Sequence, residues 1–110
     1  MGRMKIPQIS VQELETKIKN HDEFVLIDVR EMEEYEFCKI DSSYLIPLGS
    51  FEKEMARLKK EKEYVLMCRS GGRSTEAVKI MIQNGFTNVK NLTGGILQWS
   101  SDIDPSLPTY

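Results

Sequence analysis

The chain has 110 residues, of which 40% are hydrophobic and 29% are charged. This length and composition are typical of one folded domain, here residues 1–110, and exclude a disordered chain or a second catalytic domain. The formal net charge of −2 leaves no basic excess for nucleic acid, and no apolar run is long enough for a signal sequence or a membrane-spanning helix. We therefore expect a protein that binds neither nucleic acid nor membranes.

Segments typical of strands and of helices alternate along the chain. In its first half the predicted elements are a helix over 11–19, a strand over 24–29, a helical turn over 31–37, a brief strand over 44–46 that ends at Pro47, and a helix capped by Ser50 that carries Phe51, Met55 and Leu58 on one face. The first helix is indicated by a capping-box pattern, because Glu13 follows Ser10 by three residues. The strand over 24–29 is an almost continuous apolar run, which is typical of an interior strand buried on both faces.

The second half of the chain continues this alternation. It contains a strand over 64–67, a loop over 68–74, a helix that carries Ala77, Val78, Met81 and Ile82 and ends at Asn84-Gly85, a strand over 88–92, a turn at Gly94-Gly95, and a last helix that begins over 96–99. Strands that alternate with helices build a parallel sheet covered by helices, so the sequence predicts an α/β fold.

The segment best suited to chemistry follows the strand over 64–67. Cys68 stands at the carboxyl end of that strand, before a glycine-bearing loop and the start of a helix, where ligands bind in open α/β sheets. Gly71 and Gly72 are expected to adopt positive φ angles, so that backbone N–H groups converge on the Cys68 sulfur. Arg69 and Arg73 would add positive charge for a thiolate and an anionic substrate. The predicted site has Cys68 as the nucleophile and, around the substrate, Arg69, Ser70, Gly71, Gly72, Arg73 and Ser74.

Activation of this thiol requires more than the helix itself. A free cysteine has a pKa of about 8.5, and lowering it by two units requires about 2.7 kcal/mol. A helix dipole supplies about 0.3–1 kcal/mol, whereas charge-assisted hydrogen bonds supply about 1.5–3 kcal/mol. No histidine neighbours Cys68 in the sequence, so amides and arginines are the expected activators and a Cys–His protease arrangement is not favoured. The simpler alternative is that Cys68 is a small buried hydrophobic residue.

Other conspicuous residues have structural explanations. Cys38 has no glycine or basic cluster beside it, so a resolving or catalytic role is not favoured, and His21 is expected in a turn and Trp99 in the core. Two cysteines are too few for a secreted disulfide framework and indicate a reducing, cytoplasmic location. Two separated cysteines and one histidine also offer too few ligands for zinc, and we expect no cofactor.

Asp28 and Arg30 follow the strand over 24–29 and can support the site. If that strand is parallel to the one before Cys68, both strands end at the same edge of the sheet. One interpretation is a structural ion pair with neighbours such as Glu34, and the other is a direct part in the geometry of the site.

The sequence resembles the rhodanese-like (sulfurtransferase) domain family over nearly its whole length. The resemblance rests on CRSGGRS at 68–74, VLIDVREMEEYE at 25–36, IPL at 46–48, NGFTNVKNLTGG at 84–95 and Trp99. It implies a three-layer fold, with a five-stranded parallel sheet flanked by helices on both faces, and Cys68 as a persulfide-forming nucleophile cradled by the amides of residues 69–73.

Two features qualify this resemblance. Where the family usually has Gly-His-Ile, often followed by Gly-Ala, this chain has CKIDSS at 38–43, so the local turn is expected to differ and Lys39 to alter the rim of the site. The tail from Gly94 resembles the end of the rhodanese-like domain attached to E1-like adenylyltransferases, which supply sulfur to ubiquitin-like sulfur carriers. A free-standing relative and an excised domain both remain open.

Three functions are compatible with these residues. The leading hypothesis is a sulfurtransferase that takes sulfur from thiosulfate or a protein persulfide through Cys68. The second is a sulfur-relay or docking domain for a sulfur-carrier protein, with little activity toward thiosulfate. The third is a cysteine-dependent phosphatase or arsenate reductase, but its C-x5-R loop is one residue longer than the C-x4-R of Cys68 to Arg73.

Overall fold

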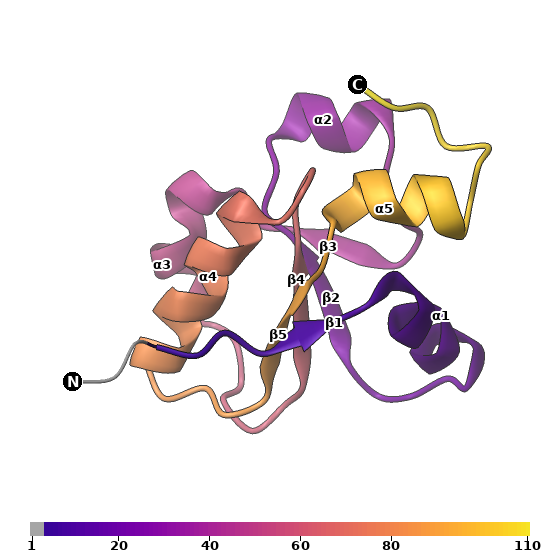
Figure 1. Cartoon of the computed structure of the whole chain (residues 1–110). Coiled ribbons are helices and arrows are strands. Elements are labelled where there is room, and N and C mark those ends of the chain that lie inside the picture. Colours follow the sequence, from indigo (N-terminus) through magenta and orange to yellow (C-terminus); the bar gives the residue numbers. More distant parts are fainter. Residues whose placement is uncertain (1–3) are drawn as a thin grey trace.

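The computed structural model describes residues 4–110 and contains five parallel strands in the order β1-β5-β4-β2-β3 (Figure 1). The strands are β1 (Gln8–Ile9), β2 (Val25–Asp28), β3 (Ser43–Leu45), β4 (Tyr64–Met67) and β5 (Val89–Leu92). The central strand, β4, pairs with β2 on one side and with β5 on the other. The expected α/β fold with a parallel sheet is therefore confirmed.

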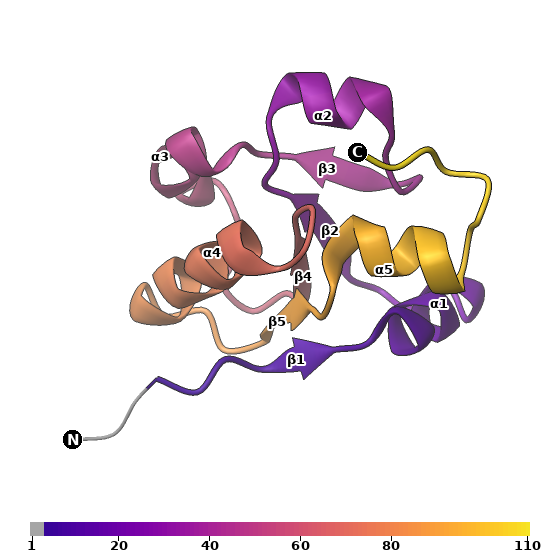
Figure 2. The ribbon, with the colours of Figure 1, turned by 45° about the horizontal axis from the view of Figure 1, so that its top comes forward.

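Helices cover both faces of the sheet and give the three expected layers (Figure 2). α1 (Val11–Lys19) and α5 (Gly95–Asp102) pack on one face, α3 (Phe51–Met55) and α4 (Gly72–Gln83) pack on the other, and α2 (Met32–Phe37) lies beyond the carboxyl ends of the strands. Side chains of β4 alternate between the two cores, with Tyr64 and Leu66 on the α4 side and Val65 and Met67 on the α1 side. Within residues 4–110 no helix is long and apolar enough to cross a membrane.

Several predicted elements are confirmed with close boundaries. The Ser10 hydroxyl accepts from the Glu13 amide at 3.0 Å, and the Glu13 carboxylate accepts from the Ser10 amide at 2.9 Å, so the capping box that begins α1 is complete. β2 is an interior strand that pairs with both β3 and β4, as its apolar run predicted. α4 is followed by Gly85 at φ +91°, the left-handed conformation expected at a helix end.

One strand was missed, and the predicted cap of α3 is wrong. The sequence did not indicate β1, because two residues are too few for an alternating pattern to be visible. Ser50 makes no side-chain cap for α3. It ends a 3₁₀ turn, η1 (Leu48–Ser50), and its hydroxyl instead donates to the Pro47 carbonyl at 3.3 Å. α3 ends at Met55, so Leu58 packs against the core from outside the helix.

Candidate active site

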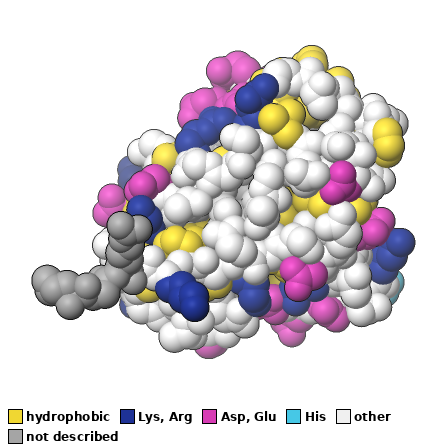
Figure 3. Space-filling model, viewed as in Figure 1, with side chains coloured by type: hydrophobic (Ala, Val, Ile, Leu, Met, Phe, Trp, Pro, Cys, Tyr) yellow, Lys and Arg dark blue, Asp and Glu magenta, His cyan; other side chains and the backbone are white. Residues whose placement is uncertain are grey.

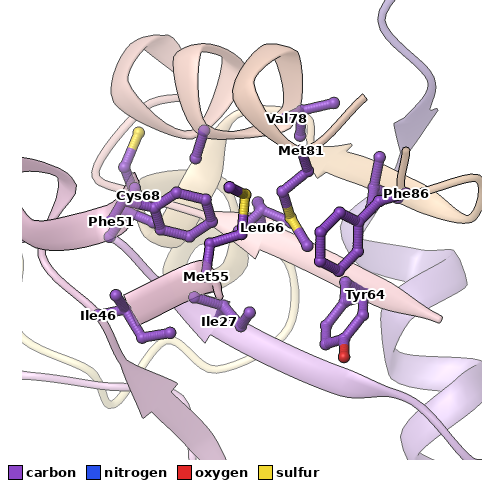
Figure 4. Close-up of a cluster of buried hydrophobic side chains, with 13 residues drawn as sticks. Ile27, Ile46, Phe51, Met55, Tyr64, Leu66, Cys68, Val78, Met81 and Phe86 are labelled. Atoms are coloured by element: carbon purple, nitrogen blue, oxygen red, sulfur yellow. The ribbon is translucent and has the colours of Figure 1, made fainter. Parts of the chain in front are cut away.

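The candidate site lies where the central strand meets a helix. β4 ends at Met67, Cys68 follows, and α4 begins at Gly72. Cys68 belongs to the buried core on the α4 side, and only 1% of the residue is exposed. Its sulfur points away from the other labelled core side chains (Figure 4). The sequence thus places a nearly enclosed thiol at the carboxyl edge of the sheet, as predicted.

Donor groups from the loop and from α4 converge on this sulfur. The Gly71 amide donates to Cys68 Sγ at 3.1 Å, and the Ser74 hydroxyl lies 3.3 Å from the same atom. Gly71 adopts φ +119°, which only glycine takes without strain and which lets the chain turn from the loop into α4. Gly72 does not have the expected positive φ. It is the first residue of α4 and is helical, so a single left-handed glycine suffices for this turn.

The hydrogen bonds determine the direction of the pKa shift at Cys68. Burial by itself raises the pKa of the thiol, because it disfavours the charged form. Hydrogen bonds from the Ser74 hydroxyl and amide, and from the backbone of Gly71 and Ser70, outweigh this effect. The pKa of Cys68 therefore lies below its ordinary value, and the thiolate is favoured without a neighbouring histidine.

Ser74 is held in place from the next strand. Its hydroxyl lies 2.5 Å from Oδ1 of Asn91 on β5, and Asn91 Nδ2 donates to the Gln8 side chain on β1 at 2.9 Å. A hydroxyl carries one proton, so Ser74 can donate either to Asn91 or to the Cys68 sulfur at a given moment. Asn91 therefore positions the hydroxyl that reaches the sulfur, and the short strand β1 supports Asn91.

The loop is also tied to the start of α5. The Ile96 amide donates to the Cys68 carbonyl at 3.0 Å, and the Leu97 amide donates to the Arg69 carbonyl at 3.1 Å. Gly95 has φ +60°, and a Cβ atom there would come within 2.5 Å of both carbonyl oxygens. A glycine is required at this position because the helix must approach the loop backbone so closely.

The two arginines of the loop do not point freely into the site. Arg73 makes a double ion pair with Glu34 on α2, at 2.7 and 2.9 Å. This pair is the main reason that the pKa of Glu34 falls to about 2, well below its ordinary value. Arg69 donates from two nitrogens to the carbonyl oxygen of Tyr110, at 2.7 Å from Nε. Both guanidinium groups thus already have acceptors, a carboxylate for Arg73 and a carbonyl oxygen for Arg69.

Asp28 and Arg30 form a fully buried ion pair at 2.7 Å, as the structural interpretation expected. The partner of Arg30 is the Asp28 carboxylate, while Glu34 contributes only its backbone carbonyl, at 3.3 Å. Arg30 also donates to the Cys38 carbonyl at 2.7 Å. The pair therefore contacts α2 at the Glu34 carbonyl and at its C-cap, Cys38.

The remaining candidates lie apart from the thiol. Cys38 is buried in the core on the α1 side, and Trp99 packs in the same cluster. His21 follows α1 at φ +56°, before β2 begins, so it lies at the amino edge of the sheet. Lys39 lies over the Tyr35 ring at 4.9 Å, and the turn that follows contains Ser42 at φ +72°.

Three residues at the site were not predicted. Glu34 was considered only as a neighbour of Asp28 and Arg30, and Asn91 and Tyr110 were not singled out. Asn91 carried little signal, because the same strand also contains Lys90, and only the structure shows that Asn91 is buried and hydrogen-bonded. The contacts of Glu34 and Tyr110 cross 39 and 41 residues of sequence, and no local pattern indicates them.

The known proteins that this chain resembles agree with one another in family. The model of the rhodanese-like domain matches residues 10–102. "Putative sulfurtransferase YtwF" of Bacillus subtilis (strain 168) is 40% identical over 102 residues, which cover 93% of this chain and 98% of that protein. The adenylyltransferase and sulfurtransferase MOCS3-2 of Zea mays is 32% identical, and the match covers 94% of this chain but only 23% of the maize protein.

A solved structure shows the same fold. The human single-domain sulfurtransferase TSTD1 superposes with a TM-score of 0.80 at 25% identity, over 89% of this chain and 98% of the human one. Together with the sequence relatives, this confirms both the rhodanese-like resemblance and the likeness to the domain found in adenylyltransferase and sulfurtransferase proteins.

Proposed function

The chain belongs to the rhodanese-like domain family, and from that premise we propose that it is a sulfurtransferase with Cys68 as its nucleophile. Cys68 receives a sulfane sulfur from thiosulfate or from a protein persulfide and passes it to a nucleophilic acceptor. A ubiquitin-like sulfur carrier is one such acceptor, because the chain resembles the domain of MOCS3-2, whose name includes both adenylyltransferase and sulfurtransferase.

The proposed reaction has two displacement steps. The Cys68 thiolate attacks the outer sulfur of thiosulfate, an S–S bond forms, and sulfite leaves with the electron pair of the broken S–S bond. The acceptor then attacks the terminal sulfur of the Cys68 persulfide, and the Cys68 thiolate leaves. Both steps displace a sulfur-centred anion, so donors that stabilise a negative sulfur serve both of them.

The observation that carries this proposal is the donor set around Cys68. The Gly71 amide at 3.1 Å and the Ser74 hydroxyl at 3.3 Å stabilise a thiolate, and the enlarged anion of a persulfide requires the same kind of donors. A phosphatase instead needs its loop arginine to face a tetrahedral oxyanion. Here the Arg73 guanidinium is committed to Glu34, which favours sulfur transfer.

Intact mass spectrometry after incubation with thiosulfate tests the proposal. We expect a gain of one sulfur atom that cyanide removes. The gain should vanish in Cys68→Ser and persist in the matched variant Cys38→Ser, which removes the other free thiol. Hydrolysis of an aryl phosphate without any sulfur adduct on Cys68 would contradict the proposal and favour the phosphatase alternative.

Comparing a protein persulfide with thiosulfate as the sulfur donor tests the relay form of this function. If a protein persulfide loads Cys68 and thiosulfate does so only slowly, the domain serves as a sulfur relay. The nucleophile and the persulfide are the same in both cases, so the mass shift on Cys68 is expected with either donor.

A further inference from the structure

The segment after α5 crosses the molecule and ends beside the active-site loop. It is anchored near its start, because the Asp104 amide donates to the Trp99 carbonyl at 3.0 Å and the Ser100 hydroxyl donates to the Leu107 carbonyl at 3.0 Å. Leu107 packs against the core under α5. From there the segment passes to α2 (Figure 1) and places Tyr110 at the rim of the site.

The side chain of Tyr110 is held by several groups at once. Its hydroxyl accepts from Arg30 Nη1 at 2.9 Å and donates to Glu34 Oε2 at 2.7 Å. Its ring meets the Phe37 ring edge-on, with centroids 5.8 Å apart. The two hydrogen bonds join Tyr110 to residues that lie 80 and 76 positions earlier in the sequence. They therefore attach the end of the segment to Arg30 and Glu34.

Tyr110 contacts Arg69 through two groups, its backbone carbonyl and its ring. The Tyr110 carbonyl accepts from the Arg69 guanidinium, and that guanidinium lies over the Tyr110 ring at 5.1 Å from its centroid. Because Tyr110 also contacts Glu34, the partner of Arg73, one residue touches Arg69 directly and the carboxylate that pairs with Arg73. In the space-filling view basic, acidic and hydrophobic side chains meet at this end of the molecule (Figure 3).

This pairing has a consequence for substrates. A small dianion such as thiosulfate would be attracted by free guanidinium groups at the mouth of the site. With Arg69 bound to Tyr110 and Arg73 bound to Glu34, neither cation is available to such a donor. Cys68 is also only 1% exposed, so a donor must displace part of the rim to reach it.

We propose that Tyr110 is a positioning residue of the sulfur-transfer site that withholds Arg69 from small anionic donors. While Tyr110 is in place, the site disfavours donors such as thiosulfate. When Tyr110 is displaced, Arg69 turns to bind the donor anion. This inference rests on the proposed function, since it concerns the choice of donor for the same cysteine.

Steady-state kinetics with thiosulfate test the proposal. Tyr110→Ala removes the hydroxyl and ring contacts that hold this residue at Arg30, Glu34 and Phe37, so its backbone carbonyl should no longer stay on Arg69. KM should then fall by about tenfold, the size of one recovered charge-assisted contact, while kcat changes little. Tyr110→Phe keeps the ring contacts and should lower KM by less. The control is Tyr44→Ala, an exposed tyrosine on β3, which should leave KM unchanged. An unchanged or raised KM in Tyr110→Ala would overturn the proposal.

A double-variant cycle identifies the group that Tyr110 withholds. In an Arg69→Ala background, the substitution Tyr110→Ala should no longer lower KM, because the cation that it releases is gone. If Tyr110→Ala lowers KM equally in both backgrounds, Tyr110 acts only by blocking access, and its assignment to Arg69 is wrong.

Alkylation of Cys68 separates this proposal from the proposed function. The rate ratio of anionic iodoacetate to neutral iodoacetamide, followed at the Cys68 peptide, should rise several-fold in Tyr110→Ala and not in Tyr44→Ala. This ratio does not depend on sulfur transfer. If no persulfide forms on wild-type Cys68 from any donor, the proposed function fails, whereas an unchanged alkylation ratio overturns the role of Tyr110.

Discussion

Cys68 and Cys38 are both free thiols in the interior of the protein, with 1% and 6% of each residue exposed. They lie in different cores, on opposite faces of the sheet. Arg30 Nη1 lies 3.9 Å from Cys38 Sγ, and that guanidinium is directed mainly to Asp28. Cys68 has an amide at 3.1 Å and a hydroxyl at 3.3 Å.

The contrast shows that burial alone does not make a cysteine inert or reactive. Desolvation disfavours a thiolate, and at Cys68 the hydrogen bonds reverse that effect because a glycine with positive φ and a helix start aim their donors at one atom. Cys38 instead contributes its backbone carbonyl to the surroundings of a buried ion pair. This difference in surroundings supports the proposed chemical role of Cys68 and a structural role for Cys38.

The largest effect is expected on the structural side of this comparison. Asp28→Asn leaves the Arg30 charge buried and without its carboxylate partner, so it should lower the free energy of unfolding by about 3–5 kcal/mol. Urea unfolding measures this loss. The matched control is Glu76→Gln, which breaks an exposed ion pair with Lys79 and should change stability by less than about 0.5 kcal/mol. A similar, small change in both variants would show that the buried pair is not a support.

A smaller effect is expected on the chemical side. Ser74→Ala removes the hydroxyl from Cys68 Sγ, so the pKa of Cys68 should rise and persulfide formation near neutral pH should slow by about tenfold or more. The rate of sulfur loading by mass spectrometry measures this. Ser50→Ala, far from the thiol in sequence and exposed, serves as the control. An unchanged rate in Ser74→Ala would mean that the loop amides alone activate Cys68.

The smallest effect is expected at Glu34, which contacts Arg73 of the Cys68 loop and Arg30 of the buried ion pair near Cys38. Its pKa is about 2 in the folded protein and 4.5 in an ordinary peptide, so its stabilising contribution is complete above pH 4.5 and is lost as the pH falls toward about 2. Urea unfolding of wild type and Glu34→Gln should differ most above pH 4.5 and converge below it. A difference that stays constant over this range would contradict the assigned ion pair with Arg73.

Local patterns were sufficient to predict much of the fold and the centre of the site. The capping box at Ser10 and the strand before Cys68 depend on neighbouring residues, so they are visible in the sequence. The role of Gly71 was also predictable, because few other residues can turn a strand so sharply into a helix. Gly72 was predicted wrongly, since the sequence does not show which of two adjacent glycines takes the turn.

The rest of the site depends on contacts between distant segments. Asn91 acts on the thiol through Ser74 only because β5 lies beside β4 in the sheet. Arg73 was expected to face the substrate, but the acidic residue that pairs with it comes from α2. Tyr110 reaches Arg69 only after the last segment has folded back across α5. Such pairings follow from topology, which composition and spacing do not specify.

The central claim is that hydrogen-bond donors make Cys68 a nucleophile despite its burial, and the pH dependence of its alkylation tests this most directly. The rate of modification of Cys68 by neutral iodoacetamide, followed at its own peptide in the folded protein, should reach half of its maximum at a pH below about 8.5, the ordinary pKa of a free thiol. A midpoint at or above that value would mean that desolvation prevails, and it would contradict the account.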